Sequence, residues 1–533
     1  MVRGNRALDS REPGGAPEAA RGLPAVWPGL FFFGILLALS LLIYWPVLNN
    51  TLIADDYFWM HLGKAIPAAH LWKLFTVQPH FSVRPLTALT FWVQSRLFFL
   101  NPWPSHLINV VLHAGAASVL SWILLRLGAG KLTAVAAALL FVLTPMAPEA
   151  VTWSSGRFDV LATFLILLAV GLYGVSLLKH SRGAFLGAMA AAAAAMLSKE
   201  TALVLVIILP MMEFMYGGLN LSSAGGDGAS MLGELRWRMA RQAKFLLSER
   251  GFFLRVSILF LIVIANVILR FAILGKLGGY PNVPLFGRPV PGSVLASFKA
   301  LISPLNRFEA PRLAILALAA YTLALLLVGA FLVIFRWSRS SVMAKRLLLL
   351  LGALFVLTVA PVYTPLFIFG VSQGLMDSRE LYAPTVFFIA IMSVALLEFG
   401  WRERSWRIGA SAALLILIPV YASGLYLNNR TWQRGAAVNY SLLKQTAALV
   451  PDPPWGAKMT FVNVPDWKNG SYIFITGLPA AVHLTYGRDD LTVTRPANAV
   501  ITAPGAIPGD ADGYIFYYSQ SDGLLQLVRQ PRR

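Results

Sequence analysis

The chain has 533 residues, of which 57% are hydrophobic and only 13% are charged. Long apolar runs recur along most of its length, which excludes a soluble protein and indicates a polytopic membrane protein. The formal net charge of +20 does not indicate nucleic-acid binding, because the basic residues fall mostly in short gaps between apolar runs, as the positive-inside rule expects. The absence of cysteine excludes disulfides and thiol catalysis.

Residues 1–25 are polar and arginine-containing, and they predict a disordered cytoplasmic tail. The run from Val26 to Leu48 is long enough to cross a bilayer as a helix, and the arginines before it place the N-terminus inside. It lacks a convincing cleavage site, so we interpret it as a signal anchor. The segment that follows, to Leu100, mixes aromatic and basic residues, which favours helices lying in the membrane interface.

Further apolar runs predict about eleven spans in all. After the first, four of them lie at 105–126, 131–145, 157–179 and 253–274. The other six end near residues 198, 216, 336, 361, 402 and 427. This arrangement places the arginine-rich segments 236–255, 336–346 and 402–407 in the cytoplasm and a Pro/Gly-rich loop, 276–311, outside. The predicted fold class is an all-α polytopic membrane protein.

The end of the chain differs in kind from the rest. Residues 26–430 form the predicted transmembrane domain, and residues 431–533 form a small extracytoplasmic β-rich domain. In the latter, short β-prone runs alternate with Pro/Gly/Asp turns. These runs are 459–464, 472–476, 491–494 and 514–518. We expect this unit to rest over the outer mouth of the transmembrane domain and to select or shield an acceptor.

Asp55 and Asp56 form an adjacent acid pair directly after the first predicted span. A carboxylate at the membrane surface can accept a proton from a hydroxyl whose reaction partner is delivered by lipid. Two adjacent carboxylates repel, so at least one should titrate above an ordinary aspartate. On an extended loop such neighbours point in opposite directions, and only one can then face a site. An isolated Asp-Asp pair is most often a solvated loop feature, so the rest of the chain decides its meaning.

Other ionisable side chains gather at the predicted outer ends of the spans. They are Arg84, His106, Glu149, Arg157, Asp159, Lys199, Glu200 and Arg379. Ionisable residues in such positions are candidate functional groups. A transporter would more often carry polar groups near the midplane and internal repeats. The distribution favours an enzyme that acts on a phosphate-bearing lipid, with arginine and lysine side chains as ligands of the phosphate.

Three structural alternatives remain for these residues, and they concern the pairs His106/His113, Lys199/Glu200 and Arg157/Asp159. The histidines lie on one helical face and could hydrogen-bond to neighbouring helices. The second pair could be an ion pair at a helix end, and the third could pair at the start of the fourth span. The acids and a histidine could together hold a divalent metal, but no tight ligand spacing supports this alternative, so we name no metal ligands.

Taken together, the motifs resemble the GT-C superfamily of glycosyltransferases. They are the acid pair, Arg84-Pro85-Leu86, His106-Leu107-Ile108-Asn109 with His113, Glu149-Ala150-Val151 with Gly156-Arg157 and Asp159, Ser198-Lys199-Glu200, and the run Arg379–Tyr382–Pro384. Their order over roughly residues 26–400 is most similar to the protein O-mannosyltransferases of the transmembrane and tetratricopeptide-repeat group. The chain departs from that group because it has no such repeats and carries the β-rich segment instead, which leaves the acceptor open.

The resemblance implies a glycosyltransferase that takes a sugar from a polyprenyl-phosphate-linked donor and passes it to a protein or glycolipid acceptor on the extracytoplasmic side of a bacterial inner membrane. The leaving group is already a phosphate, so it needs charge neutralisation, and one carboxylate suffices as the base. Glycosidases, in contrast, need two carboxylates across the bond. A ligase or polymerase of lipid-linked glycans, and a transporter or flippase, are the alternative functions.

The resemblance favours Asp55 as the general base. The other acid of the pair is expected to orient the acceptor or to raise the pKa of its neighbour. The expected donor-phosphate ligands are Arg379, Arg157, Lys199, Arg84 and His106, and the expected supporting residues are Glu149, Asp159, Glu200 and Tyr382. No cofactor is expected beyond the lipid donor, and the expected partners are that donor, the acceptor and membrane lipids.

Overall fold

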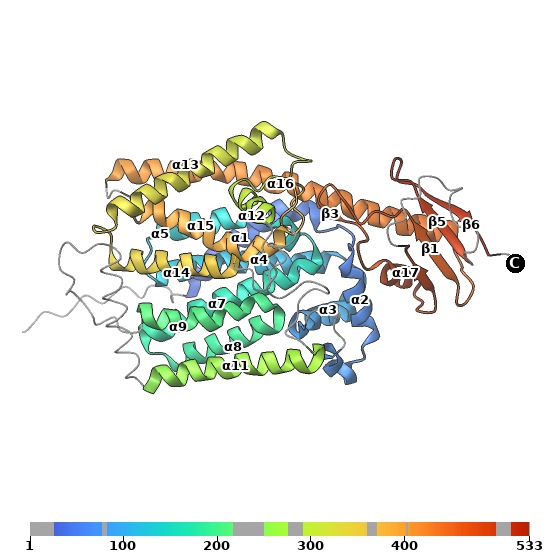
Figure 1. Cartoon of the computed structure of the whole chain (residues 1–533), viewed down its shortest axis with the longest axis horizontal. Coiled ribbons are helices and arrows are strands. Elements are labelled where there is room, and N and C mark those ends of the chain that lie inside the picture. The colour runs from blue at the N-terminus through green and yellow to red at the C-terminus, as the bar shows by residue number, and fades with distance from the viewer. Residues whose placement is uncertain are drawn as a thin grey trace, which may run out of the picture.

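A computed structural model describes residues 26–76, 83–216, 250–275, 291–359, 370–400, 403–496 and 513–531. A bundle of long helices forms one end of the molecule, a small sheet region forms the other, and helix α16 runs from the first to the second (Figure 1). The predicted tail 1–25 lies outside the described residues, as do residues 236–249 of the first arginine-rich segment and residues 276–290 of the predicted Pro/Gly-rich loop.

Each predicted span coincides with a helix of the bundle. These helices are α1 (Val26–Tyr44), α4 (Trp103–Arg126), α5 (Lys131–Val142), α7 (Arg157–Lys179), α8 (Arg182–Ser198), α9 (Leu205–Tyr216), α11 (Arg250–Leu274), α13 (Arg312–Arg336), α14 (Val342–Val359), α15 (Tyr382–Leu397) and α16 (Arg404–Leu449). In the described part of the chain, 8 helical segments are long and apolar enough to cross a membrane. The chain is therefore a multi-pass membrane protein. Helices α5, α8 and α9 are shorter than a span, with 12, 17 and 12 residues, so the count of eleven stays a prediction.

Small residues let the helices of the bundle approach one another closely, as is common in membranes. The alanine-rich helix α8 packs along α7. At Gly171 of α7, any side chain would overlap the indole ring of Trp122 on α4. This packing fixes the ends of α7 and α8, from which several of the candidate site residues project.

Short helices and 3-10 turns connect the long helices. They are η1 (Trp45–Val47), α2 (Asp55–Ala65), η2 (Ala68–Phe75), α3 (Pro85–Phe98), α6 (Pro148–Val151), η3 (Ser154–Gly156), η4 (Glu200–Val204), α12 (Pro291–Ile302) and η6 (Ser378–Leu381). The described part of the first long connection is largely helical, as its composition predicts. Trp72 in this connection and Trp45 just before it are exposed, and tryptophan is typical of membrane interfaces. The expectation of an extended loop at the acid pair is wrong. Asp55 and Asp56 form the first turn of α2, where the helix dipole favours carboxylates.

Helix α16 extends well beyond the last predicted span. It runs for 46 residues to Leu449, so the predicted domain boundary at residue 430 falls inside this helix. Strands β1 (Lys458–Val462), β4 (Thr492–Thr494), β5 (Tyr514–Tyr518) and β6 (Leu525–Arg529) then form a sheet in the order β4-β1-β5-β6. Strand β1 pairs in parallel with both β4 and β5, whereas β6 is antiparallel to β5.

The predicted sheet region is thus present, with two additions that the sequence patterns did not reveal. Helix α17 (Leu478–Tyr486) precedes β4 in the chain, and β6 closes one edge of the sheet. The predicted run 472–476 is not a strand of this sheet. It begins in the hairpin β2 (Trp467–Lys468) and β3 (Ser471–Tyr472) and continues as an irregular segment.

This hairpin packs directly on the helical bundle. The side-chain amide of Asn306 donates hydrogen bonds to the carbonyl oxygens of Gly374 (3.1 Å) and Asn469 (2.9 Å). At Gly435 of α16, any side chain would overlap the hydroxyl of Ser471. The hairpin and α16 therefore meet at backbone distance, which holds the residues that follow β3 against the bundle.

Candidate active site

Asp56 is buried, and its carboxylate accepts three hydrogen bonds. Its carboxylate accepts from the backbone N–H of Ile53 (3.0 Å), and from the backbone N–H (2.7 Å) and hydroxyl (2.5 Å) of Ser155. Burial raises the pKa of Asp56 to about 7 despite these bonds, and the charge of Asp55 adds to the rise. Asp56 therefore ties the start of α2 to η3 and holds Asp55 in place.

Asp55 is the more accessible of the two acids. Its carboxylate is half-buried and accepts a hydrogen bond from the hydroxyl of Thr476, which follows strand β3. Burial raises the pKa of Asp55, and the Thr476 bond and the charges of Arg379 and Arg84 oppose that rise. Ala54, directly before it, has φ 48° and ψ −115°, a strain of order 1–3 kcal/mol for a residue with a side chain. Such strain is typical of functional sites, and here it sets the direction of Asp55.

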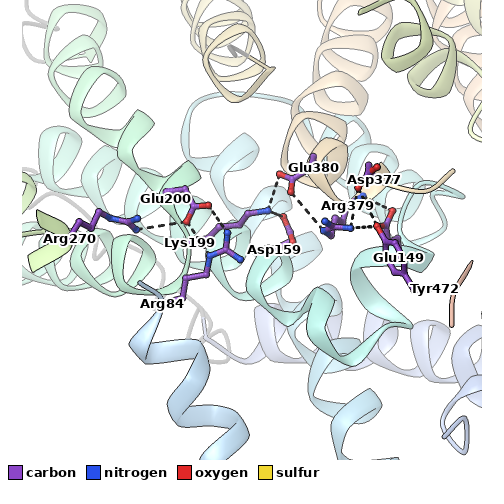
Figure 2. Close-up of polar contacts among 10 residues, drawn as sticks. All are labelled: Arg84, Glu149, Asp159, Lys199, Glu200, Arg270, Asp377, Arg379, Glu380 and Tyr472. Atoms are coloured by element: carbon purple, nitrogen blue, oxygen red, sulfur yellow. Dashed lines mark hydrogen bonds and ion pairs between the residues drawn. The ribbon is translucent and has the colours of Figure 1, made fainter. Parts of the chain in front are cut away.

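Charged side chains of both signs form a row (Figure 2), and two of its arginines, Arg84 and Arg379, act electrostatically on Asp55. Its members are Arg270, Glu200, Arg84, Lys199, Asp159, Glu380, Arg379, Asp377, Glu149 and the hydroxyl of Tyr472. They come from α11, η4, the start of α3, α7, η6, α6 and β3. The row therefore gathers segments that are distant in the sequence, and each of its cations lies beside carboxylates.

One end of the row is centred on Arg379. Its Nη1 donates to the carboxylate of Glu149 and to the hydroxyl of Tyr472 (2.6 Å), and the carboxylate of Asp377 lies 3.5 Å from the same nitrogen. Glu149 also accepts from the hydroxyl of Ser378 (3.0 Å) and the backbone N–H of Arg379 (3.2 Å). Burial raises the pKa of Glu149 to about 7, although the charge of Arg379 opposes the rise. Glu149 is therefore the main partner that holds Arg379.

Lys199 and Glu200 lie in different parts of the row and bind different partners. The Lys199 ammonium lies between Asp159 (2.5 Å) and Glu380 (2.9 Å). Arg84 donates to both carboxylate oxygens of Glu200, from Nε at 3.1 Å and from Nη2 at 2.5 Å. Each member of the pair thus binds other partners, and the alternative of a helix-end ion pair between the two does not describe the structure.

Arg157 lies apart from this row in a cage of neutral groups. Its guanidinium donates to the side chains of Asn109 (3.1 Å), Thr90 (3.2 Å) and Gln94 (2.7 Å) and to Ser105, and it stacks on the ring of Phe91. The side chain is completely buried. These contacts give Arg157 a structural part, joining α7 to α3 and α4, and they do not match the predicted pairing with Asp159.

The predicted histidine and tyrosine residues also join helices. His106 Nε2 donates to the carbonyl of Asn50 (2.9 Å), which anchors the segment that leads to the acid pair. His113 hydrogen-bonds to the hydroxyl of Tyr382 (2.8 Å) and to the carbonyl of Val142 (3.1 Å). His106 is buried and contacts protein groups, so we do not place it at the phosphate.

Sequence reasoning missed the side chains supplied by the hairpin region. The hydroxyl of Tyr472 accepts a hydrogen bond from Arg379, and that of Thr476 donates one to Asp55. From the sequence, this segment was predicted to be an ordinary β-strand. No local pattern marks them, because their partners lie far away in the chain. Glu380 was also missed, although its position directly after Arg379 could have marked it as a candidate.

Comparison with known proteins agrees with the predicted resemblance, although no family model matches the chain. A segment is 37% identical over 131 residues to human protein O-mannosyl-transferase TMTC2, covering 23% of this chain and 15% of that protein. Mouse protein O-mannosyl-transferase TMTC3 is 42% identical over 90 residues, which is 17% of this chain and 10% of the mouse protein. The matches thus span only a small part of these relatives' length.

A solved structure matches nearly the whole chain. ArnT from Cupriavidus metallidurans bound to undecaprenyl phosphate superposes with a TM-score of 0.52 at 14% sequence identity, covering 92% of this chain and 93% of that one. The chain has the GT-C fold. The predicted fold class and the resemblance to the O-mannosyltransferases are therefore confirmed.

Gly477 tests the contact between the hairpin region and the acid pair. Its φ is +79°, and any side chain would overlap the carbonyl oxygen of Ala54. We expect Gly477→Ala to push Thr476 away from Asp55, with a loss of about 1–3 kcal/mol in stability and a fall in any activity that depends on Asp55. Gly487→Ala is the matched control, because its φ is +68° and nothing lies within 4 Å of an added Cβ. Equal thermal stability and activity in the two variants would contradict the proposed contact.

Proposed function

We propose that the chain is a GT-C glycosyltransferase that transfers a sugar from a polyprenyl-phosphate-linked donor to an acceptor on the extracytoplasmic side of a bacterial inner membrane. The observation that carries this proposal is the position of Asp55. It is a half-buried carboxylate in the first turn of α2, and this helix lies at the end of the bundle nearest the sheet region (Figure 1). The charges of Arg84 and Arg379 both act on Asp55.

Asp55 has the properties of a general base for the acceptor hydroxyl. Burial raises its pKa, which brings the carboxylate closer to the basicity that is most effective near neutral pH. In the proposed step, the hydroxyl oxygen attacks the anomeric carbon as its proton passes to Asp55. The bond from that carbon to the phosphate oxygen breaks, and the polyprenyl phosphate leaves with the electron pair. Thr476 and Asp56 keep the carboxylate in position for this transfer.

Arg379 and Arg84 are the best-placed ligands for the donor phosphate. Their side chains are 14% and 13% exposed, whereas that of Lys199 is 3% exposed and clamped between two carboxylates. Arginine can hold a phosphate through two parallel hydrogen bonds. A donor phosphate would replace part of the carboxylate contacts that Glu149 and Glu200 now make. Lys199, Asp159 and Glu380 lie between Arg84 and Arg379 in the row and would then hold these two arginines at a fixed separation.

The comparisons support the donor and suggest the acceptor. The structural neighbour ArnT was solved bound to undecaprenyl phosphate, and the sequence relatives are named protein O-mannosyl-transferases. A polyprenyl-phosphate mannose as donor and a protein hydroxyl as acceptor are therefore the first substrates to test.

Glycan analysis of a deletion strain tests the proposal in cells. We expect mass spectrometry to find one hexose-bearing glycoconjugate that is lost on deletion and restored by the wild-type gene, but not by a gene encoding Asp55→Asn. The variant must reach the membrane at the wild-type level for the comparison to count. If the Asp55→Asn variant restored the glycoconjugate, Asp55 would not be the general base. An unchanged glycan profile in the deletion strain would contradict the proposed function.

Membrane topology gives an independent prediction. With an extracytoplasmic site, the segments 336–346 and 402–407 should be cytoplasmic, and residues after 449, where α16 ends, should be outside. Phosphatase and fluorescent reporter fusions at Ser340 and Pro531 distinguish the two sides. A cytoplasmic signal from the Pro531 fusion would place the site on the wrong face of the membrane.

A further inference from the structure

A second cluster of ionisable side chains lies at the junction of α2 with α17. His61 of α2 donates from Nε2 to the carboxylate of Asp489 (2.8 Å), and the ring of His483 of α17 lies with its centroid 5.6 Å from that of His61. One ligand atom from each of the three residues lies within 4.8 Å of the others. The proposed sugar transfer makes no use of these residues.

We propose that His61, His483 and Asp489 bind a zinc ion that fastens α2 to the C-terminal region. Two imidazoles and one carboxylate are a ligand set that suits zinc and related transition metals rather than magnesium or calcium. In a tetrahedral zinc site the ligand atoms lie about 3.4 Å apart, given bonds of about 2.0–2.2 Å. The three side chains therefore need only small movements, and the Asp489 side chain, which is 74% exposed, can make them. A water molecule would complete the coordination.

The hydrogen bonding of His483 supports a metal ligand. Its Nε2 lies 2.8 Å from the carbonyl oxygen of Leu491. A carbonyl can only accept, so Nε2 carries the hydrogen and Nδ1 of the neutral ring is left with a lone pair. Histidine ligands of metals almost always donate their other ring N–H in this way, which fixes the tautomer and the ring orientation.

Charges near the cluster affect how tightly it would bind a metal ion. The carboxylate of Asp489 faces His61 at the surface, where a metal can reach it. Lys64 on α2 also acts on Asp489, and its ammonium lies over the ring of Phe99. That positive charge opposes a cation, so we expect micromolar rather than picomolar binding.

The location of the cluster indicates a structural rather than a catalytic role for the metal. His61 lies six residues after Asp55 on α2, about 9 Å along the helix axis. On the other side, α17 begins directly after Thr476 and Gly477, which contact Asp55 and Ala54. A metal between the two helices would hold the hairpin region against the candidate base without touching the reacting atoms.

Zinc titration of the purified full-length chain tests this inference without any substrate. After treatment with a chelator, we expect isothermal titration calorimetry to show one zinc ion per chain, no comparable binding of magnesium, and a zinc-dependent rise in melting temperature. His483→Ala and Asp489→Asn should each weaken zinc binding at least tenfold and abolish the thermal shift. His70→Ala, at an exposed histidine of η2, is the matched control and should behave as wild type.

Asp489→Asn alters one exposed side chain, so this variant keeps the test valid if His483→Ala fails to fold. Absence of zinc binding by the wild type, or undiminished binding by the folded Asp489→Asn variant, would overturn the site. Because neither readout uses sugar transfer, the result is independent of the proposed function.

Discussion

Asp55→Asn is expected to lower the turnover of sugar transfer by about two to four orders of magnitude, the usual contribution of a general base. Asparagine keeps the size of the side chain and an oxygen that can accept from Thr476, but it cannot take up the acceptor's proton. Donor binding should be retained, since the phosphate ligands are unchanged. Steady-state kinetics in proteoliposomes, with the Michaelis constant for the donor measured separately, check both parts of this prediction.

Two comparisons make the Asp55 result specific. Asp452→Asn changes an exposed aspartate and should leave turnover unaltered. Asp56→Asn should lower thermal stability together with turnover, because the amide places a donor opposite N–H and O–H groups that now bond to a buried carboxylate. If Asp55→Asn is as active as Asp452→Asn, the acid pair is not the centre of the site.

The pH profile provides a further check on the same group. A base must be deprotonated, so activity should be present above the pKa of Asp55 and should fall as the pH drops through it. Burial raises that pKa, so the acid limb should lie closer to neutrality than the ordinary value of about 3.9. A profile that stays flat down to pH 4 would show that no raised carboxylate is required.

Arg379→Ala is expected to raise the Michaelis constant for the lipid donor by about one to two orders of magnitude. A charge-assisted contact contributes about 1.5–3 kcal/mol, and Arg379 is a partly exposed cation that also acts on Asp55. Arg379→Lys keeps the charge but loses the bidentate geometry, so its effect should be smaller. Initial rates at graded donor concentrations measure this effect.

Controls separate donor binding from loss of structure. Arg379→Ala leaves Glu149 buried without its main cation, so the melting temperature must be measured alongside the kinetics. Arg434→Ala removes a half-exposed arginine that pairs with Glu309 and should leave donor dependence unchanged. An Arg379→Ala protein that is folded and has a wild-type Michaelis constant would move the phosphate site elsewhere, with Arg84 as the next candidate.

The helices could be predicted from the sequence because apolar runs and basic gaps report directly on the membrane. The same signals were less informative where burial depends on distant partners. The short α5 was counted as a span because its apolar run continues to Pro145, although the helix itself ends at Val142. The end of α16 at Leu449 was missed because its last turns pack on the sheet region rather than on lipid.

The candidate site could be predicted in its composition but not in its connections. Asp55 and Arg379 were chosen as candidates because each is an unusual charge beside an apolar run. Lys199 and Arg157 have the same local appearance, yet one is clamped by Asp159 and Glu380 and the other is enclosed by neutral groups. Such differences arise from contacts between residues 40 or more positions apart, which no local pattern reveals.

Transfer by the purified chain from a labelled polyprenyl-phosphate mannose in proteoliposomes tests the account most directly. We predict that wild-type protein moves the label to a hydroxyl-bearing acceptor peptide and releases one polyprenyl phosphate for each sugar transferred, while folded Asp55→Asn protein binds the donor and releases almost none. Wild-type protein that carries the donor across the bilayer intact, with no release of polyprenyl phosphate from any lipid-linked sugar supplied, would contradict the proposal that this chain is a glycosyltransferase.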